Sequence, residues 1–250
     1  MPDDRNDPFA TAALRGRVLD AWAASPARFR EDANAEEDYA LGGYRDRVVV
    51  ELAQNAADAA ARAGVPGRLR LTLRDGTLVA ANTGAPLDAA GVEALSTLRA
   101  SSKRDHGADG APATVGRFGV GFAAVVAVTD SPRIHSATGS VGWSRERSGL
   151  LVAGVPALAG ELEARGGHVP VLRLPFPDGD RPDDLPPAGF TTSVELPLRD
   201  AAAIGLVARL LAETGPALLL ALPALAEIVI ETDQGSRVLT AVRADDRVTV

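Results

Sequence analysis

The sequence predicts an α/β fold in which amphipathic helices alternate with strands that pair mainly in an antiparallel way. The clearest helix is expected over residues 44–63, where apolar residues recur at helical spacing and a glycine follows. The clearest strand pair is expected over residues 68–81, where alternating patterns flank an Asp-Gly turn. Residues 192–198 alternate in the same way and lead into a helical pattern over residues 201–214.

Shorter patterns predict the remaining elements. Further helices are expected over residues 8–29, 88–98 and 122–128, and further strands over residues 133–136, 142–147, 169–174 and 247–250, with a hairpin over residues 228–242. The polar segments are expected to be irregular, and they cover residues 30–38, 99–115 and 175–189. A loop as long as 99–115 inside a compact domain is usually functional.

The composition fits a globular protein and argues against several classes of function. The 250 residues are 46% hydrophobic and 24% charged, which supports a core. The net charge of −7 repels phosphate backbones, so nucleic-acid binding is not expected. Neither an apolar run long enough to cross a membrane nor a signal peptide is found, so a cytoplasmic protein with no membrane contact is expected.

The chain contains no cysteine, which excludes disulfides and thiolate metal sites. Its three histidines, His106, His135 and His168, are far apart and fit no zinc-ligand spacing. Polar groups of other kinds must therefore carry any chemistry.

The first such group is Glu51, Asn55 and Asp58, in the string Glu-Leu-Ala-Gln-Asn-Ala-Ala-Asp-Ala. Spacings of four and three residues put these side chains on one face of the predicted helix. The rest of the helix is rich in Ala, Val and Leu, so a polar floor of a pocket is one interpretation. Taken alone, a solvated helix face explains the motif as well.

The second group is the glycine-rich string Gly116-Arg117-Phe118-Gly119-Val120-Gly121, which leads into an apolar segment beginning at Phe122. Glycines before a helix leave backbone amides free to approach a phosphate. A dinucleotide-binding fold would need a strand directly before this string, and a P-loop would need Gly-Lys-Ser/Thr; neither is found.

Two shorter signals complete the pattern. Asn82-Thr83-Gly84 stands at the end of a predicted strand, and Thr192 begins a late strand. Each alone indicates no more than a turn or a strand start. Their order along the chain, with the Glu-x-x-x-Asn helix first and the glycine string between them, is the informative feature.

This order resembles the nucleotide-binding pattern of the GHKL ATPases. The helix motif is similar to their N-box, Asn82 to Gly84 to their first glycine box, residues 116–121 to their second, and Thr192 to their final threonine. The helix string and Phe-Gly-Val-Gly-Phe look most like the sacsin and No-vein branch, which is related to the ninety-kilodalton heat-shock chaperones. The resemblance covers roughly residues 44–198.

The resemblance implies a Bergerat fold, a two-layer α/β (α+β) sandwich with helices on one face of a mixed, mainly antiparallel sheet. It implies that Asn55 ligates Mg²⁺, that Glu51 is the general base, and that Asp58 lines the pocket. Residues 99–115 would form the lid. The residues expected to contact nucleotide are Asn55, Asp58, Asn82, Gly84, Ser102, Lys103, Gly116, Phe118, Gly119, Val120, Gly121, Phe122 and Thr192. A solvated loop charge is the alternative interpretation of Lys103.

The chain departs from the family pattern at Asn82, where the family normally has an aspartate that accepts a hydrogen bond from the adenine amino group. An amide can still accept through its oxygen, but its NH₂ adds donors that a carboxylate lacks. Pro86 also stands where a glycine is usual. Base selectivity is therefore less well specified by the sequence than phosphate binding.

The expected function is ATP binding with Mg²⁺ and slow hydrolysis to ADP and phosphate, with the lid closing in response to nucleotide. A nucleotide-binding signalling module with little turnover is the alternative. The resemblance also implies a chaperone-like role with protein clients and a nucleotide-dependent homodimer. The expected organisation is an N-terminal helix and polar segment (1–40), the ATP-binding domain (41–225), and a hairpin or the start of a following domain (226–250).

Overall fold

The computed structural model describes residues 7–42, 45–97, 121–178, 185–244 and 247–249. They form an α/β fold around one open eight-stranded sheet of strand order β5-β4-β3-β6-β2-β1-β7-β8. Its neighbouring strands are antiparallel except for the parallel pair β1 and β7, which confirms the predicted mixed, mainly antiparallel sheet. The strands are β1 (Gly67–Arg74), β2 (Thr77–Asn82), β3 (Arg133–Ser136), β4 (Gly139–Gly142), β5 (Phe176–Asp178), β6 (Thr192–Pro197), β7 (Leu225–Thr232) and β8 (Gly235–Thr240), and a separate hairpin joins β9 (Val242–Ala244) to β10 (Arg247–Thr249).

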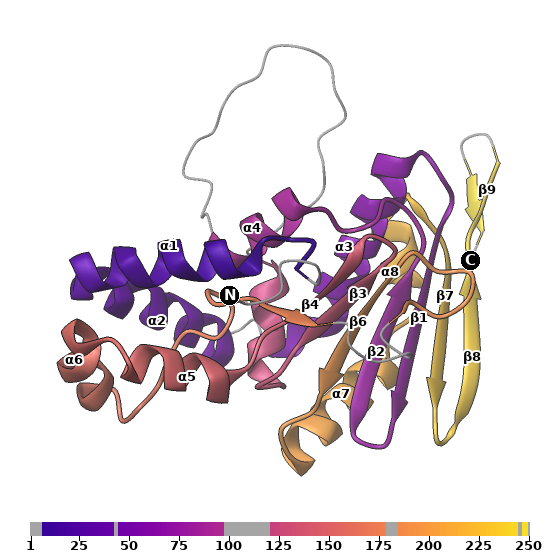
Figure 1. The fold of residues 1–250 in the computed structure, drawn as a ribbon. Coiled ribbons are helices and arrows are strands. Elements are labelled where there is room, and N and C mark those ends of the chain that lie inside the picture. The colour runs from indigo at the N-terminus through magenta and orange to yellow at the C-terminus, as the bar shows by residue number, and fades with distance from the viewer. Residues whose placement is uncertain (1–6, 43–44, 98–120, 179–184, 245–246, 250) are drawn as a thin grey trace.

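The helices fall into two groups. In Figure 1, α1, α2, α5 and α6 lie beyond the β4–β5 end of the sheet, whereas α3, α7 and α8 lie with the longer strands. The α-helices are α1 (Thr11–Ala24), α2 (Pro26–Leu41), α3 (Val48–Ala63), α4 (Ala89–Thr97), α5 (Arg145–Ala153), α6 (Ala159–Ala164), α7 (Ala201–Glu213) and α8 (Pro216–Ala221), and the 3₁₀ helices are η2 (Arg45–Arg47), η3 (Gly121–Ala127) and η4 (Pro156–Leu158). Among the described residues, no helix is long and apolar enough to cross a membrane.

One face of the sheet is covered and the other is polar. In β1, Leu69, Leu71 and Leu73 are buried, while the residues between them are half-buried or exposed. Helix α3 packs against β1, β2 and β7 and contacts α7. On the other face, charged side chains pair across strands, as between Arg68 Nε and Glu227 Oε1 at 2.9 Å. This arrangement is typical of a sheet with one solvated face and confirms that the helices cover one side.

The predicted hairpin is confirmed in detail. Asp75 and Gly76 have φ values of 49° and 71° and connect β1 directly to β2. Two central residues with positive φ match the right-handed twist of the strands that they join, and Asp-Gly is a favoured pair for that conformation. Gly64 ends α3 with a φ of 64°, also as expected from the sequence.

The predicted structure of the N-terminal region is wrong in two respects. The helix expected over residues 8–29 is interrupted at Ser25, because Pro26 begins a new helix and restricts the residue before it. The polar stretch 30–38, expected to be irregular, belongs to α2. Its acidic side chains have interior partners: Trp22 Nε1 donates to Asp32 Oδ2 at 2.8 Å, and Glu36 accepts from the backbone of Val171 and Leu172.

The segment after β3 also differs from expectation. Residues 142–147 were expected to form a strand, but β4 ends at Gly142 and Ser144 caps α5 by accepting a hydrogen bond from the Arg147 backbone. Residues 169–174 are irregular: Val169 and Leu174 join a second core with Trp22 and Phe29, whereas Val171 and Leu172 belong to the main core. Residues 122–128 were expected to be α-helical, and η3 is a 3₁₀ helix.

The turn after β2 approaches α3 very closely. The Ala85 amide donates to the Ala59 carbonyl at 2.9 Å. A Cβ atom at Gly84 would lie 2.4 Å from the carbonyl carbon of Ala59, and the φ of Gly84 is 122°. Only glycine fits this position without displacing the helix backbone. The contact fixes the end of β2 against the C-terminal part of α3.

We predict that Gly84→Ala destabilises the fold by about 3 kcal/mol, since unfavourable backbone dihedrals and overpacking each cost roughly 1–3 kcal/mol. The measurement is the free energy of unfolding in urea. Gly167→Ala is the matched control, because Gly167 has a φ of 83° but no atom within 4 Å of the added Cβ. Its expected loss is about 1 kcal/mol, from strain alone. Equal losses in the two variants would show that the approach to α3 is not tightly packed.

Candidate functional site

Six segments of the chain meet around a small cavity between α3 and the sheet. Its volume is about 50 Å³. The segments are α3, the end of β2 with the following turn, α4, the start of η3, β3 and β6. The cavity is lined by Asn55, Ala59, Arg62, Asn82, Ala85, Leu87, Leu95, Phe122, Ile134, Thr192 and Val194. Four of the residues predicted to contact nucleotide are therefore brought together: Asn55, Asn82, Phe122 and Thr192.

Strand register explains how two of them come to lie side by side. Asn82 is the direct cross-strand partner of Thr192 in the β2–β6 pair, and Thr192 is the partner of Ser136 in the β3–β6 pair. The Ser136 and Thr192 hydroxyl oxygens lie 3.2 Å apart, and Ser136 Oγ also accepts from the Leu87 amide at 3.0 Å. Ser136 thus ties the strands to the turn that closes the cavity.

The amide of Asn82 has a defined orientation. Its Nδ2 donates to the Thr83 carbonyl at 3.1 Å, and the reverse orientation would bring two oxygens together. The side chain is 8% exposed. Asn82 therefore keeps Oδ1 as an acceptor, as a carboxylate would offer at the same place, and the second Nδ2 hydrogen as a donor.

Glu51 lies against the start of η3. It is only 8% exposed, and its Oε2 would be 2.1 Å from a Cβ atom at Gly121. Gly121 therefore allows the backbone of the glycine-rich segment to touch this carboxyl group. Arg47 Nε forms an ion pair with Glu51 Oε1 at 3.2 Å. Burial raises the pKa of Glu51, and the charge of Arg47 opposes that shift.

Asp58, one turn after Asn55, is buried with 6% exposure. Burial raises its pKa to about 6, and the positive charge of Arg62 acts in the opposite direction. Asp58 does not line the cavity itself, but it interacts electrostatically with Arg62, which does. Arg62 was not identified from the sequence, although it lies seven residues after Asn55 and so falls on the same helix face.

The protein oxygens at the cavity fit a cation that takes most of its ligands from bound phosphates and waters. Asn55 is half-buried and offers one amide oxygen. Among the described residues, no three His, Asp or Glu side chains form a cluster that could hold a metal ion. Mg²⁺ is commonly bound through one or two protein oxygens together with substrate phosphates and waters, which matches a single amide ligand.

Several predicted site residues lie outside the described residues. They are Ser102, Lys103, Gly116, Phe118, Gly119 and Val120, together with the lid predicted over residues 99–115. Gly84 is described but does not line the cavity; its place is the close contact with α3.

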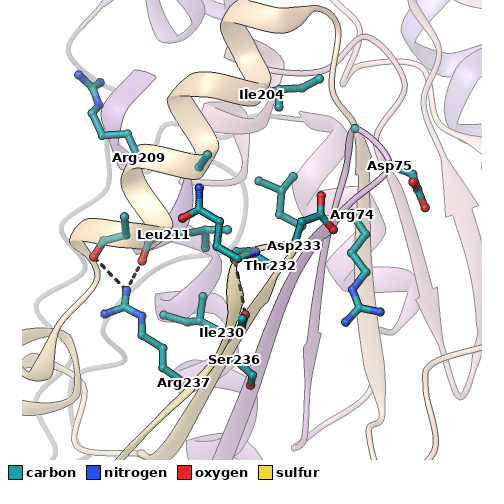
Figure 2. A pocket seen from close by; sticks show the side chains of 16 residues that line it. Arg74, Asp75, Ile204, Arg209, Leu211, Ile230, Thr232, Asp233, Ser236 and Arg237 are labelled. Atoms are coloured by element: carbon teal, nitrogen blue, oxygen red, sulfur yellow. Dashed lines mark hydrogen bonds between the residues drawn. The ribbon is translucent and has the colours of Figure 1, made fainter.

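A much larger cavity lies elsewhere, at the far end of the β1–β2 hairpin (Figure 2). Its volume is about 720 Å³, and it opens between α7 and the turns that join β1 to β2 and β7 to β8. Arg237 in this cavity donates to the carbonyl of Ala212 at 3.1 Å and also to that of Leu211, so it caps the end of α7. Neither Glu51 nor any residue predicted to contact nucleotide lines this cavity.

Comparison with known proteins gives no independent assignment. No protein-family model matches this chain, and a search of curated proteins finds no significant match. The function must therefore be argued from the site.

Asp58 supplies a test of how the site affects stability. Because its folded-state pKa of about 6 lies above the ordinary value of 3.8, its contribution to stability is fully present below about pH 3.8 and is lost as the pH rises through 6. We predict that Asp58→Asn stabilises the protein more at pH 8 than at pH 4, by on the order of 2 kcal/mol. Urea unfolding at both pH values measures this difference. Asp20→Asn, at an exposed position of α1, is the control for the removal of a surface carboxylate.

Proposed function

We propose that this domain binds ATP with Mg²⁺ between α3 and the sheet and hydrolyses it slowly to ADP and phosphate, as the resemblance to the GHKL ATPases implies. The observation that carries the proposal is the meeting of Asn55, Asn82, Phe122 and Thr192 at one cavity. These residues come from four motifs whose order alone suggested the resemblance, and chance placement would scatter them over the fold.

The cavity suits the base end of a nucleotide. Its walls include the apolar side chains of Leu87, Leu95, Ile134 and Val194, which suit a flat aromatic ring, and Asn82 Oδ1 provides an acceptor. At about 50 Å³ the cavity has room for only a few water molecules, so its walls would have to move apart to admit an adenine ring. The phosphates would lie outside it, towards Glu51 and Gly121.

At the phosphate end, Asn55 would ligate Mg²⁺, and the bound ion would neutralise charge on the phosphates. In hydrolysis a water oxygen bonds to the γ-phosphorus as the bond from phosphorus to the bridging oxygen breaks, and ADP leaves with that electron pair. Glu51 would accept the proton that the water loses. A carboxylate whose pKa is raised by burial is a better base than an exposed one.

The second candidate is a nucleotide-binding signalling module without meaningful turnover. Asn82 favours it, because a neutral acceptor binds an amino group less strongly than a carboxylate does. A histidine kinase is a poorer match: Glu51 has no place in phosphate transfer to histidine, His135 is buried within β3, and His168 lies on a loop. Protein clients and a nucleotide-dependent homodimer are proposals that follow from the resemblance, and a cytoplasmic location is a proposal that follows from the sequence pattern.

We predict that Asn55→Ala and Glu51→Ala separate binding from turnover. Asn55→Ala should abolish the magnesium dependence of ATP binding, measured by calorimetry. Glu51→Ala should bind Mg-ATP normally and lose about 10² to 10⁴ in turnover, the usual contribution of a general base. Equal magnesium dependence in wild type and Asn55→Ala would remove the metal role. Binding without turnover in the wild type would favour the signalling module.

We predict that Asn82→Asp increases the preference for ATP over GTP several-fold. A hydrogen bond to a charged group contributes roughly 1.5–3 kcal/mol, against about 1 kcal/mol for a neutral pair, and guanine presents a carbonyl where adenine presents its amino group. The variant also loses the bond from Nδ2 to the Thr83 carbonyl, so its unfolding free energy should fall by about 1 kcal/mol. Competition binding of the two nucleotides is the measurement. An unchanged ratio would mean that Asn82 does not contact the base.

A further inference from the structure

Arg47 occupies a position where helix stability favours a different residue. It is the last residue of η2 and the N-cap of α3, and its side chain makes no capping hydrogen bond. N-caps favour Ser, Thr, Asp and Asn, and the partial positive charge of a helix N-terminus favours acidic groups. A cation at this point opposes the helix dipole. Residues that break a local rule in this way are expected at functional sites.

The ion pair with Glu51 does not compensate for this disadvantage. The two residues are spaced i and i+4 with the cation first, which is the less favourable order on a helix. The Arg47 side chain is 47% exposed, and pairs with an exposed partner contribute little to stability. The pair with Glu51 therefore gives no stability reason for an arginine here.

The pair does have a clear geometric effect on Glu51. The two carboxyl oxygens of Glu51 have different neighbours. Oε1 lies 3.2 Å from Arg47 Nε, and Oε2 faces the backbone of Gly121. The terminal torsion of a glutamate is broad, so without a partner on one oxygen the carboxyl plane would turn freely. Arg47 removes that freedom from one side and the Gly121 backbone from the other.

We propose that Arg47 is a positioning residue for Glu51. Arg47 holds Oε1 of Glu51 so that Oε2 stays directed at the start of η3, where the attacking water would be activated. This inference rests on the proposed function. It assigns Arg47 no contact with nucleotide and no part in proton transfer.

The test compares Arg47→Ala and Arg47→Lys with wild type in turnover and in Mg-ATP binding. Arg47→Ala should lower kcat roughly tenfold, a part of the 10² to 10⁴ that a general base supplies, and leave the Kd for Mg-ATP within about twofold. Arg47→Lys should recover part of the loss, because it keeps the charge but not the planar guanidinium. In a Glu51→Gln background, Arg47→Ala should have no further effect on the residual rate.

Arg209→Ala is the matched control. Arg209 on α7 forms an ion pair of 3.3 Å with Asp46, which lies beside Arg47 in η2, and both side chains are more than half exposed. Its removal disturbs η2 without touching Glu51, so kcat should not change.

Three results would overturn the inference. An unchanged kcat in Arg47→Ala would show that Glu51 needs no partner. A weaker Kd with unchanged kcat would make Arg47 a contact to nucleotide instead. A tenfold loss that persists in the Glu51→Gln background would show that Arg47 acts independently of Glu51. Failure of the proposed function looks different, since wild type itself would then show no turnover above background.

Discussion

The close contact between the Gly84 turn and α3 is the constraint on which the rest of the site depends. The turn ends β2, the strand that carries Asn82, and it meets the helix that carries Glu51, Asn55 and Asp58. With no side chain between them, the two backbones approach closely enough for a direct amide-to-carbonyl hydrogen bond. A helix and a sheet normally pack about 10 Å apart through their side chains. Here one point of backbone contact sets their spacing and leaves room for a cavity beside it.

A second support acts at the other end of the site. The end of η3 is held by Arg199, which donates to the carbonyls of Val126, Ala127 and Thr129 and pairs with Asp130. A 3₁₀ helix has weak internal hydrogen bonds and seven residues is long for one, so external donors matter to η3. It runs from the contact between Gly121 and Glu51 to the end that Arg199 holds. The functional side chains therefore lie between two anchored segments.

The parts of the fold that were predictable from sequence are those determined by local pattern. The α3 helix, the β1–β2 hairpin and β6 follow from periodicity and turn residues alone, and the helix spacing put Glu51, Asn55 and Asp58 on one face. The structure of α2 was missed because Glu36 is satisfied by the backbone of residues 171 and 172, more than a hundred residues away. From the sequence pattern alone, such a carboxylate is expected to be solvated.

The site was predictable only in part for the same reason. That Asn82 lies opposite Thr192 is a matter of strand register, which the sequence specifies weakly across 110 residues of chain. The role of Ser136 depends on that register too, and its own sequence context carries no signal. Arg62 is different, since its spacing from Asn55 and Asp58 was sufficient to find it.

The parallel pairing of β1 with β7 has a consequence for how the chain folds. Thr72 and Glu231, side by side in this pair, are 159 residues apart in sequence. Parallel strands so distant are slow to find each other, because a long loop must close before any contact is gained. During synthesis at roughly 5–20 residues per second, the edge of β1 that pairs with β7 stays unpaired for many seconds after β1 is made. An open edge of this kind invites pairing with other chains. The β1 edge is therefore most vulnerable to pairing with other chains before β7 leaves the ribosome.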